Sequence, residues 1–282
     1  MAGKSWEVSD EFWQRVRPLV PPAPSHAKGG RTRMDDRRAF EAIVYILRTG
    51  IQWNALPREM GASSTVHDRF QEWVGKGFFG ALHEAGLTEY DELAGIEWAW
   101  QSADGAMGKA PLVPKGDTGG AAGPNPTDRG KRGTKKSLLT DGSGLPLAVA
   151  IDGANRHDSK LLAATIDGIV VLRPEPEDGA QHLCLDKGYD YDFVREEVSA
   201  RGYEAHIRGR SQETASGERD AEHKPRRWVV ERTISWLKGA KRLPVTASRR
   251  RGNRSRRLLG EEARELPRLH PPRLRTTHLP QH

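Results

Sequence analysis

The sequence predicts a mixed α/β domain preceded by a small all-α domain, on three observations. Apolar residues recur at helical spacing through the first 92 residues. From Gly95 onward a strand-like alternation comes first, and helical and strand-like segments then alternate. After Val245 the chain contains no Val, Ile, Phe, Tyr, Trp, Met or Cys. We therefore divide it into a helical domain at 1–92, an α/β domain at 93–245 and a tail at 246–282.

The composition excludes several classes of protein. A chain of 282 residues can bury a substantial core, and no run of about 18 apolar residues predicts a membrane span. The N-terminus lacks the apolar stretch of a secretory signal. Cys184 is the only cysteine, which excludes intrachain disulfides and cysteine-cluster zinc sites. These features predict a protein of the reducing cytoplasm without a membrane partner.

The net charge of +7 and the isoelectric point near 9.6 suggest a polyanionic partner such as nucleic acid. The excess charge is not spread evenly. The segment 246–282 holds ten arginines, three glutamates and no lysine, so the tail alone accounts for it. The basicity is therefore weak support for DNA binding by the folded body.

Three helices are expected in the first domain, where apolar residues recur every three or four positions over 12–19, 40–47 and 66–74. The last two resemble a helix-turn-helix, whose second helix would present Arg69 and Gln71 outward to DNA. An ordinary small helical bundle fits the same spacing equally well.

The second domain opens on a predicted strand at 96–104, in which alternate residues share one side. The following segment is too rich in Gly and Pro for regular structure. Further strands are expected at 134–139 and 145–151, as a hairpin turning at Asp141-Gly142, and at 182–185 and 203–207. Helices are expected at 158–166, 192–200 and 226–238.

Three acidic residues fit a site for phosphodiester chemistry, which needs convergent carboxylates that hold hard divalent cations. Asp104 closes the first predicted strand, Asp186 follows a later strand, and Glu231 lies within the last helix. Spacing alone argues little, because most acidic side chains are solvated surface groups.

The helix around Glu231 strengthens the hypothesis. Lys224, Arg227 and Lys238 fall within roughly 40° of the direction of Glu231 on a helical wheel. This polar stripe has two interpretations. It is either a solvated face with ion pairs at four-residue spacing, or a site in which Glu231 binds metal while Arg227 and Lys238 contact phosphates or orient the carboxylate.

Several blocks of the sequence resemble insertion-sequence transposases of the two-aspartate, one-glutamate (DDE) type, particularly the insertion-sequence-five group. The resemblance spans residues 5 to 244. The matching blocks, in chain order, are GIQW (50–53), DG (104–105), GPNPTDRGKRG (123–133), NRHDS (155–159) within the stretch 141–162, LDKGY (185–189) and RWVVERTISWL (227–237). Several blocks in the right order are more specific than any single motif.

The resemblance implies a ribonuclease-H-like catalytic fold in which Asp104, Asp186 and Glu231 coordinate Mg²⁺, with Mn²⁺ as a substitute. It implies strand cleavage at the ends of a mobile element and transfer of the freed 3′ hydroxyl to target DNA. The partners would be double-stranded terminal repeats, target DNA and further copies of the chain assembled on DNA in the bacterial nucleoid.

The same resemblance assigns supporting residues. The glutamate helix of the family carries tyrosine, arginine, glutamate and lysine at spacings that match Lys224, Arg227, Glu231 and Lys238. Lys224 stands at the tyrosine position, so the contribution of that tyrosine is in question here. His157 lies inside a matching block and is kept as a candidate for DNA contact or for orienting a carboxylate.

The resemblance ends after Pro244, where the family continues into a closing apolar helix. The tail is either a basic disordered segment that adds phosphate affinity or the out-of-frame product of a frameshift near Val245. The second interpretation is favoured, and it leaves open a catalytically dead relic that only occupies terminal repeats. A phosphate-loop ATPase and a His-Glu-x-x-His zinc hydrolase are excluded, because neither motif occurs.

Overall fold

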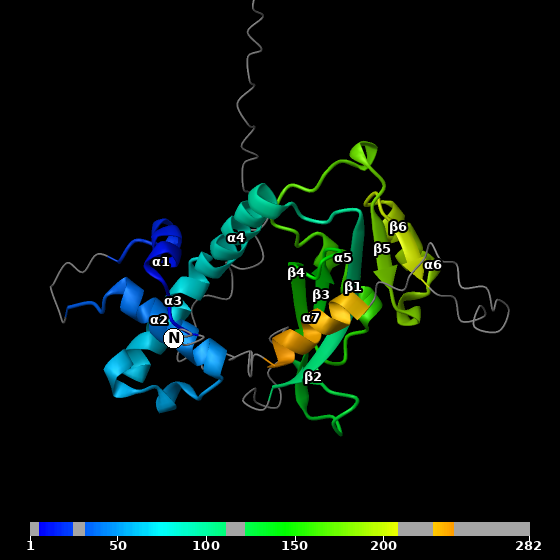
Figure 1. Cartoon of the computed structure of the whole chain (residues 1–282). Helices are drawn as coiled ribbons and strands as arrows, with labels where there is room; N and C mark the ends of the chain where they lie inside the picture. Colours follow the sequence, from blue (N-terminus) through cyan, green and yellow to red (C-terminus); the bar gives the residue numbers. More distant parts are fainter. Residues whose placement is uncertain (1–5, 25–31, 111–121, 208–227, 240–282) are drawn as a thin grey trace, which may run out of the picture. The chain divides into compact units, whose positions relative to one another are not determined.

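The computed structural model describes residues 6–24, 32–110, 122–207 and 228–239 (Figure 1). Lys224, Arg227 and the tail at 246–282 lie outside the described residues. Lys238 lies within a described helix, but its side chain is not described. Within the described residues, no helix combines the length and apolarity that crossing a membrane requires.

The N-terminal part is helical, as predicted. It contains α1 (Asp10–Val16), α2 (Asp36–Thr49), α3 (Ser63–Gly75) and α4 (Phe78–Ala94), with short 3-10 turns η1 (Arg17–Leu19), η2 (Trp53–Ala55) and η3 (Arg58–Met60). Asp35 begins α2 by accepting a hydrogen bond from the Arg38 N–H. Gly50 ends it in the left-handed conformation, with φ of 68°. Because α4 continues to Ala94, it crosses the predicted boundary between residues 92 and 93, which stays a prediction.

Aromatic side chains form the centre of this helical core. The rings of Trp73 and Phe78 lie 4.7 Å apart, and Phe40 contacts both at 6.1–6.4 Å. All three side chains are at most 2% exposed. Packing of this kind adds to the burial of apolar area and fixes how α2, α3 and α4 meet.

Arg69 does not face outward, so this part of the sequence prediction is wrong. Its side chain is 4% exposed and forms an ion pair with Asp36. It also donates to the Met34 carbonyl at 3.0 Å and lies over the Trp73 ring. Burial lowers the pKa of Arg69, and Asp36 and Glu72 partly offset that effect. The sequence pattern missed this because a buried, paired arginine has the same spacing as an exposed one.

Replacement of Arg69 by methionine is expected to destabilise the protein by about 1–3 kcal/mol, because Asp36 and the Met34 carbonyl lose their partner. Urea unfolding followed by circular dichroism measures the change. Asp68→Asn, on the exposed side of the same helix, is the control and should stay within about 0.5 kcal/mol of the parent. Equal stabilities of the two variants would contradict a packing role for Arg69.

The connection between α2 and α3 runs from residue 50 to residue 62 and includes η2 and η3. It is longer than the turn of about three or four residues in a typical helix-turn-helix. On α3, the His67 ring packs against Trp53 at 4.9 Å, and Gln71 is half-buried. The helical character predicted for this part of the chain is confirmed, and the connection is longer than the motif requires.

The second part is built on one mixed sheet. Its strands are β1 (Trp100–Lys109), β2 (Gly123–Pro124), β3 (Arg132–Thr140), β4 (Pro146–Gly153), β5 (His182–Leu185) and β6 (Glu204–Ile207). β3 pairs with both β1 and β4 in antiparallel fashion, whereas β1, β5 and β6 are parallel neighbours. The resulting order β4-β3-β1-β5-β6 is that of a ribonuclease-H-like fold, as predicted. β2 adds a short pairing at the start of β3.

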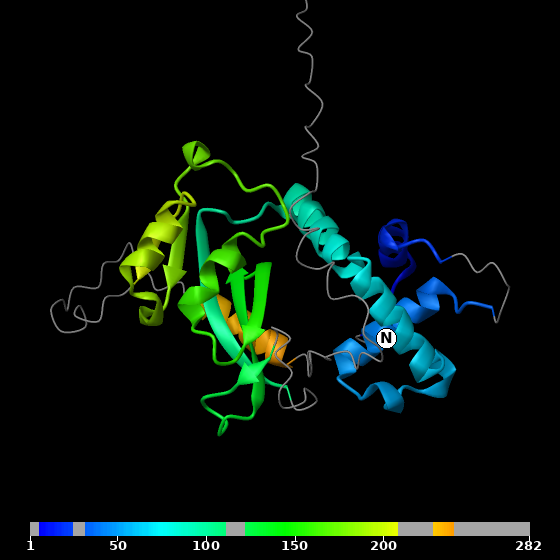
Figure 2. The same cartoon turned by 180° about the vertical axis from the view of Figure 1, so that it is seen from behind.

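Helices cover the two faces of this sheet. They are α5 (Leu162–Ile166), α6 (Asp192–Ser199) and α7 (Trp228–Gly239), with 3-10 turns η4 (Asp158–Lys160), η5 (Pro176–Asp178) and η6 (Lys187–Tyr189). We call the face under α7 the front face, where Val230 and Ile234 pack on Leu138 and Ala106. Figure 1 shows α7 lying across β1 and β3, and Figure 2 shows the sheet from the other side.

The main core lies on the opposite, back face. Residues of alternate position on the strands meet side chains of α5 and α6 there, among them Ala103, Leu139, Leu183, Leu162 and Val194. Because successive strand residues point to opposite faces, the neighbours of these core residues on β1, β3 and β5 point to the front. The front face therefore carries polar residues such as Ser102 beside the apolar Leu138 and Ala106 under α7.

Two features of the sheet differ from expectation. β1 begins at Trp100 rather than at Ile96. Ile96 is buried in the core, but it precedes the strand. β1 also continues to Lys109, so Asp104 lies inside the strand rather than at its end. This second half of β1 is held by antiparallel pairing with β3. Its sequence contains glycine and alanine, which do not favour a strand, so the sequence alone did not predict it.

Candidate active site

Asp104 lies on β1, and Asp186 directly follows the neighbouring strand β5 in the same register. β1 and β5 pair from Trp100 with His182 to Ser102 with Cys184. Two residues further come Asp104 and Asp186, and the backbone of Asp186 is still extended, with φ of −72° and ψ of 158°. Neighbouring strands lie about 4.8 Å apart, and positions two apart share a face. Both carboxylates therefore belong to the front face.

The side chain of each aspartate accepts a hydrogen bond from the backbone N–H of the next residue. Asp104 accepts a hydrogen bond from the Gly105 N–H at 2.7 Å, and Asp186 accepts one from the Lys187 N–H at 2.6 Å. Both side chains are half-buried. One oxygen of each is thereby oriented, while partial exposure keeps solvent and substrate within reach.

Glu231 belongs to the helix that packs on this face. Its neighbour Val230 is fully buried against Leu138, which pairs with Asp104 in the β1–β3 register. Glu231 itself is exposed. The third predicted carboxylate is thus carried by an element in contact with the strand of the first.

α7 is tied to the turn between β3 and β4. Thr233 donates its hydroxyl to the Gly144 carbonyl at 2.8 Å, and Arg232 donates to the Ser143 carbonyl at 2.6 Å. Gly144 has φ of 99°, a conformation that favours glycine, and the Thr233 hydroxyl lies 3.0 Å from where a side chain would begin. These contacts set the position of the helix that carries Glu231.

The donor chemistry of the three carboxylates fits Mg²⁺ or Mn²⁺, which prefer oxygen ligands. Within the described residues, their oxygens do not all come within 4.8 Å of one another.

A fourth carboxylate, Asp158, lies close to this site on the back face. It pairs with Lys135 at 3.0 Å, and Lys135 is only 7% exposed. The other oxygen of Asp158 lies over Gly105, 1.8 Å from where a Cβ would stand. Only glycine therefore fits after Asp104 while Asp158 holds this position.

Replacement of Gly105 by alanine is expected to displace Asp158 from Lys135 and to cost about 1–3 kcal/mol of stability. Thermal unfolding measures the loss. Gly188→Ala serves as the matched control, because its position has open space around it. If displacement of Asp158 causes this loss, adding Gly105→Ala to Asp158→Ala should cost little further stability. A double variant that loses the sum of the two single effects would contradict this explanation.

Tyr189, in the turn η6 that follows Asp186, belongs to the back-face core and is 1% exposed. Burial raises its pKa, and the negative charges of Asp158, Asp104 and Asp186 raise it further. The phenol therefore stays protonated at neutral pH.

His157 and Lys136 border the same region. The His157 ring meets Tyr191 edge-on at 5.8 Å, and its Nδ1 lies 2.8 Å from the Ser159 hydroxyl. This brings the matching block at 155–159 beside the loop after Asp186. Lys136, which sequence reasoning missed, shares the front face with Leu138, and burial lowers its pKa. No sequence motif identifies Lys136, because the strand register alone determines which face of the sheet its side chain takes.

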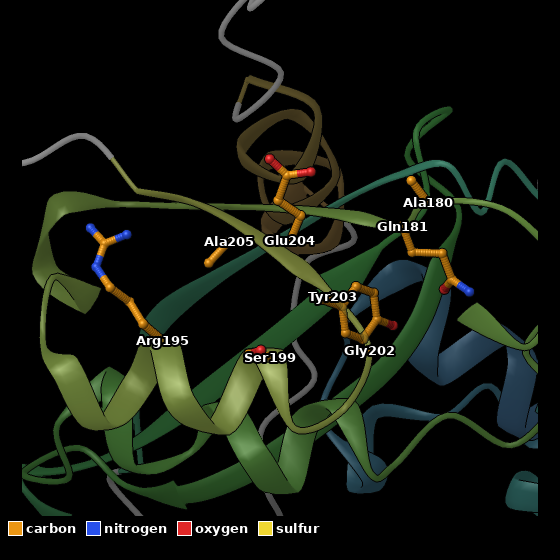
Figure 3. Close-up of a pocket in the computed structure, with 8 residues that line it drawn as sticks. All are labelled: Ala180, Gln181, Arg195, Ser199, Gly202, Tyr203, Glu204 and Ala205. Atoms are coloured by element: carbon orange, nitrogen blue, oxygen red, sulfur yellow. The ribbon is translucent and has the colours of Figure 1, made fainter. Parts of the chain in front are cut away.

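A hollow on the described surface lies elsewhere. An open pocket of about 540 Å³ lies between α6 and β6, where Arg195, Ser199 and Tyr203 contribute to its lining (Figure 3). None of the predicted site residues lines it.

Comparison with known proteins matches both parts of the chain. Residues 8–83 match a family described as "Putative transposase of IS4/5 family", and residues 108–260 match the family "Transposase DDE domain". The second match covers more than half of the chain.

Two relatives come from Burkholderia cepacia. The "Putative transposase for insertion sequence element IS402" is 40% identical over 131 residues, which are 45% of this chain and 60% of the relative. The "Insertion element IS402 uncharacterized 16.2 kDa protein" is 33% identical over 107 residues, 36% of this chain and 73% of the relative. Among solved structures, the Mos1 transposase paired-end complex is 12% identical, covering 70% of this chain and 65% of that one, with a TM-score of 0.26.

Proposed function

We propose that this chain, which belongs to the transposase DDE-domain family, binds the ends of an insertion sequence and catalyses DNA strand cleavage and strand transfer. The observation that carries the proposal is the register of Asp104 with Asp186 on the front face, together with the packing of α7, which carries Glu231, against β1 and β3. Three carboxylates from separate parts of the sequence thereby belong to one surface.

In this proposal Asp104, Asp186 and Glu231 are the catalytic residues, and they hold divalent metal ions. DDE transposases use divalent metals, and the donor set here suits Mg²⁺ or Mn²⁺. Such ions activate the attacking oxygen and stabilise the leaving oxygen of a phosphodiester. The protein orients one oxygen of each aspartate through the Gly105 and Lys187 backbone N–H groups. Tyr189 remains neutral, because burial and nearby negative charges raise its pKa.

The basic residues around the carboxylates would position DNA. Lys224 and Arg227 precede α7 in the sequence and Lys238 belongs to it, so these three would supply positive charge near Glu231. His157 contacts Tyr191, and Lys136 pairs with Ala106 on the strand of Asp104. Phosphate contacts of this kind fix the register of DNA without reading its sequence. In the helical part, Gln71 on α3 remains a candidate for DNA contact, whereas buried Arg69 does not. Assembly of several copies on paired element ends is part of the proposal.

Cleavage of a labelled duplex that carries the terminal repeat flanking the gene, with Mg²⁺ present, tests this function. The chain is compared with a version in which the reading frame after Val245 is restored. Cutting by either version at the repeat end supports the transposase. Binding of the repeat without cutting by either version would overturn the catalytic proposal and favour a protein that only occupies terminal repeats.

Cutting by the restored version alone would still support the chemistry of Asp104, Asp186 and Glu231. It would also identify this copy as a relic whose tail prevents activity, in agreement with the frameshift hypothesis. Scrambled duplex of the same length and composition is the control, because nonspecific phosphate binding does not depend on the repeat.

A further inference from the structure

Two histidines and a glutamate form a group on the front face, apart from the predicted carboxylate site. His182 on β5 pairs in register with Glu204 on β6, and His206 lies two positions further along β6. All three therefore share a face. His182 and Asp186 are four residues apart on one extended segment, or about 13 Å. The group is thus too distant to share an ion with Asp186.

The ligand atoms of this group converge. His182 Nδ1 lies 3.0 Å from His206 Nε2 and 3.2 Å from a Glu204 oxygen, and His206 Nε2 lies 3.9 Å from the other Glu204 oxygen. A tetrahedral ion with bonds of about 2.0–2.1 Å separates its ligands by about 3.3 Å. Across the described ranges, no other three His, Cys, Asp or Glu side chains bring ligand atoms within 4.8 Å of one another.

The two imidazoles are held in place by Trp100. Its ring stacks on His182 at 4.4 Å between centroids and lies 4.9 Å from His206. The histidine side chains are 21% and 19% exposed, whereas that of Glu204 is 65% exposed. Figure 3 shows Glu204 extending away from α6, on the other side of β6 from that helix. Two fixed rings and one accessible carboxylate leave a path by which an ion enters from solvent.

We propose that His182, Glu204 and His206 bind a divalent transition-metal ion and that Zn²⁺ is the preferred ion. Imidazole nitrogens suit Zn²⁺, whereas Mg²⁺ prefers oxygen ligands, so the group differs in kind from the predicted carboxylate site. The ion takes the place of the proton between the two imidazoles, which passes to solvent. Water completes the coordination. Because β6 ends the strand order of the sheet, the ion ties this strand to β5.

Equilibrium dialysis of the full chain against Zn²⁺ in excess Mg²⁺ tests the proposal, with thermal unfolding as a second readout. We expect one tight Zn²⁺ per chain and a rise in Tm with Zn²⁺. Glu204→Gln and His206→Gln should each weaken Zn²⁺ binding about tenfold or more, because even changes to groups behind the ligands cost that much. Glu204 is exposed, so its variant is expected to fold normally.

Two controls separate the possible sources of binding. Glu196→Gln, an exposed acid on α6, should leave Zn²⁺ binding unchanged, and so should Asp186→Asn. Loss of the tight Zn²⁺ in Asp186→Asn, with full retention in Glu204→Gln and His206→Gln, would overturn the proposal. Absence of tight Zn²⁺ binding by the parent chain would overturn it as well. Neither result depends on whether the chain cleaves DNA.

Discussion

Replacement of Asp186 by asparagine is expected to reduce DNA cleavage on the order of a thousandfold while leaving duplex binding nearly unchanged. Asparagine keeps the size of the side chain and an oxygen that can accept the Lys187 N–H. It removes the negative charge that a divalent ion requires. Metal assistance is worth several kcal/mol of transition-state stabilisation, and each 1.36 kcal/mol is a factor of ten in rate.

Cleavage of the labelled terminal-repeat duplex measures this effect, and a gel-shift assay measures binding in parallel. Asp192→Asn is the matched control, because Asp192 is an exposed acid at the start of α6. It should retain full cleavage. Equal cleavage by the Asp186 and Asp192 variants would remove Asp186 from the catalytic residues. The same comparison applies to Asp104→Asn and Glu231→Gln.

Replacement of Asp141 by alanine is expected to cost about 3 kcal/mol or more of folding stability. Asp141 is fully buried in the turn between β3 and β4. One of its oxygens accepts the backbone N–H groups of Ser143, Gly144 and Leu145 at 2.7–3.0 Å, and the Ser143 hydroxyl at 2.8 Å. The other accepts the Glu97 N–H at 3.2 Å. Alanine leaves all of these donors without their acceptor.

Urea unfolding measures the loss, and Ser143→Ala is the control because it removes a single exposed hydroxyl donor. We expect about 1 kcal/mol or less for that variant. The Asp141 variant should also lower cleavage, because α7 hydrogen-bonds to the carbonyls of Ser143 and Gly144. Similar stabilities of Asp141→Ala and Ser143→Ala would show that the turn does not depend on the carboxylate.

The sequence determined most of the secondary structure. Helical spacing located α2 and α3, and the Asp141-Gly142 turn correctly joined β3 to β4. The family blocks implied the ribonuclease-H-like fold that the sheet has. These features follow from local periodicity and turn chemistry, which depend only on residues close together in the sequence. The predicted site residues were named in the same way, from their motifs.

What only the tertiary structure decided depends on contacts between distant residues. The parallel register of β1 and β5 makes Asp104 and Asp186 neighbours, and no local pattern contains a register. The burial of Arg69 depends on Asp36 and Trp73, which lie on α2 and one turn along α3. The group of His182, Glu204 and His206 exists only because β5 pairs with β6. Spacing along the chain indicates which face a side chain takes, but pairing between strands and helices decides what it meets there.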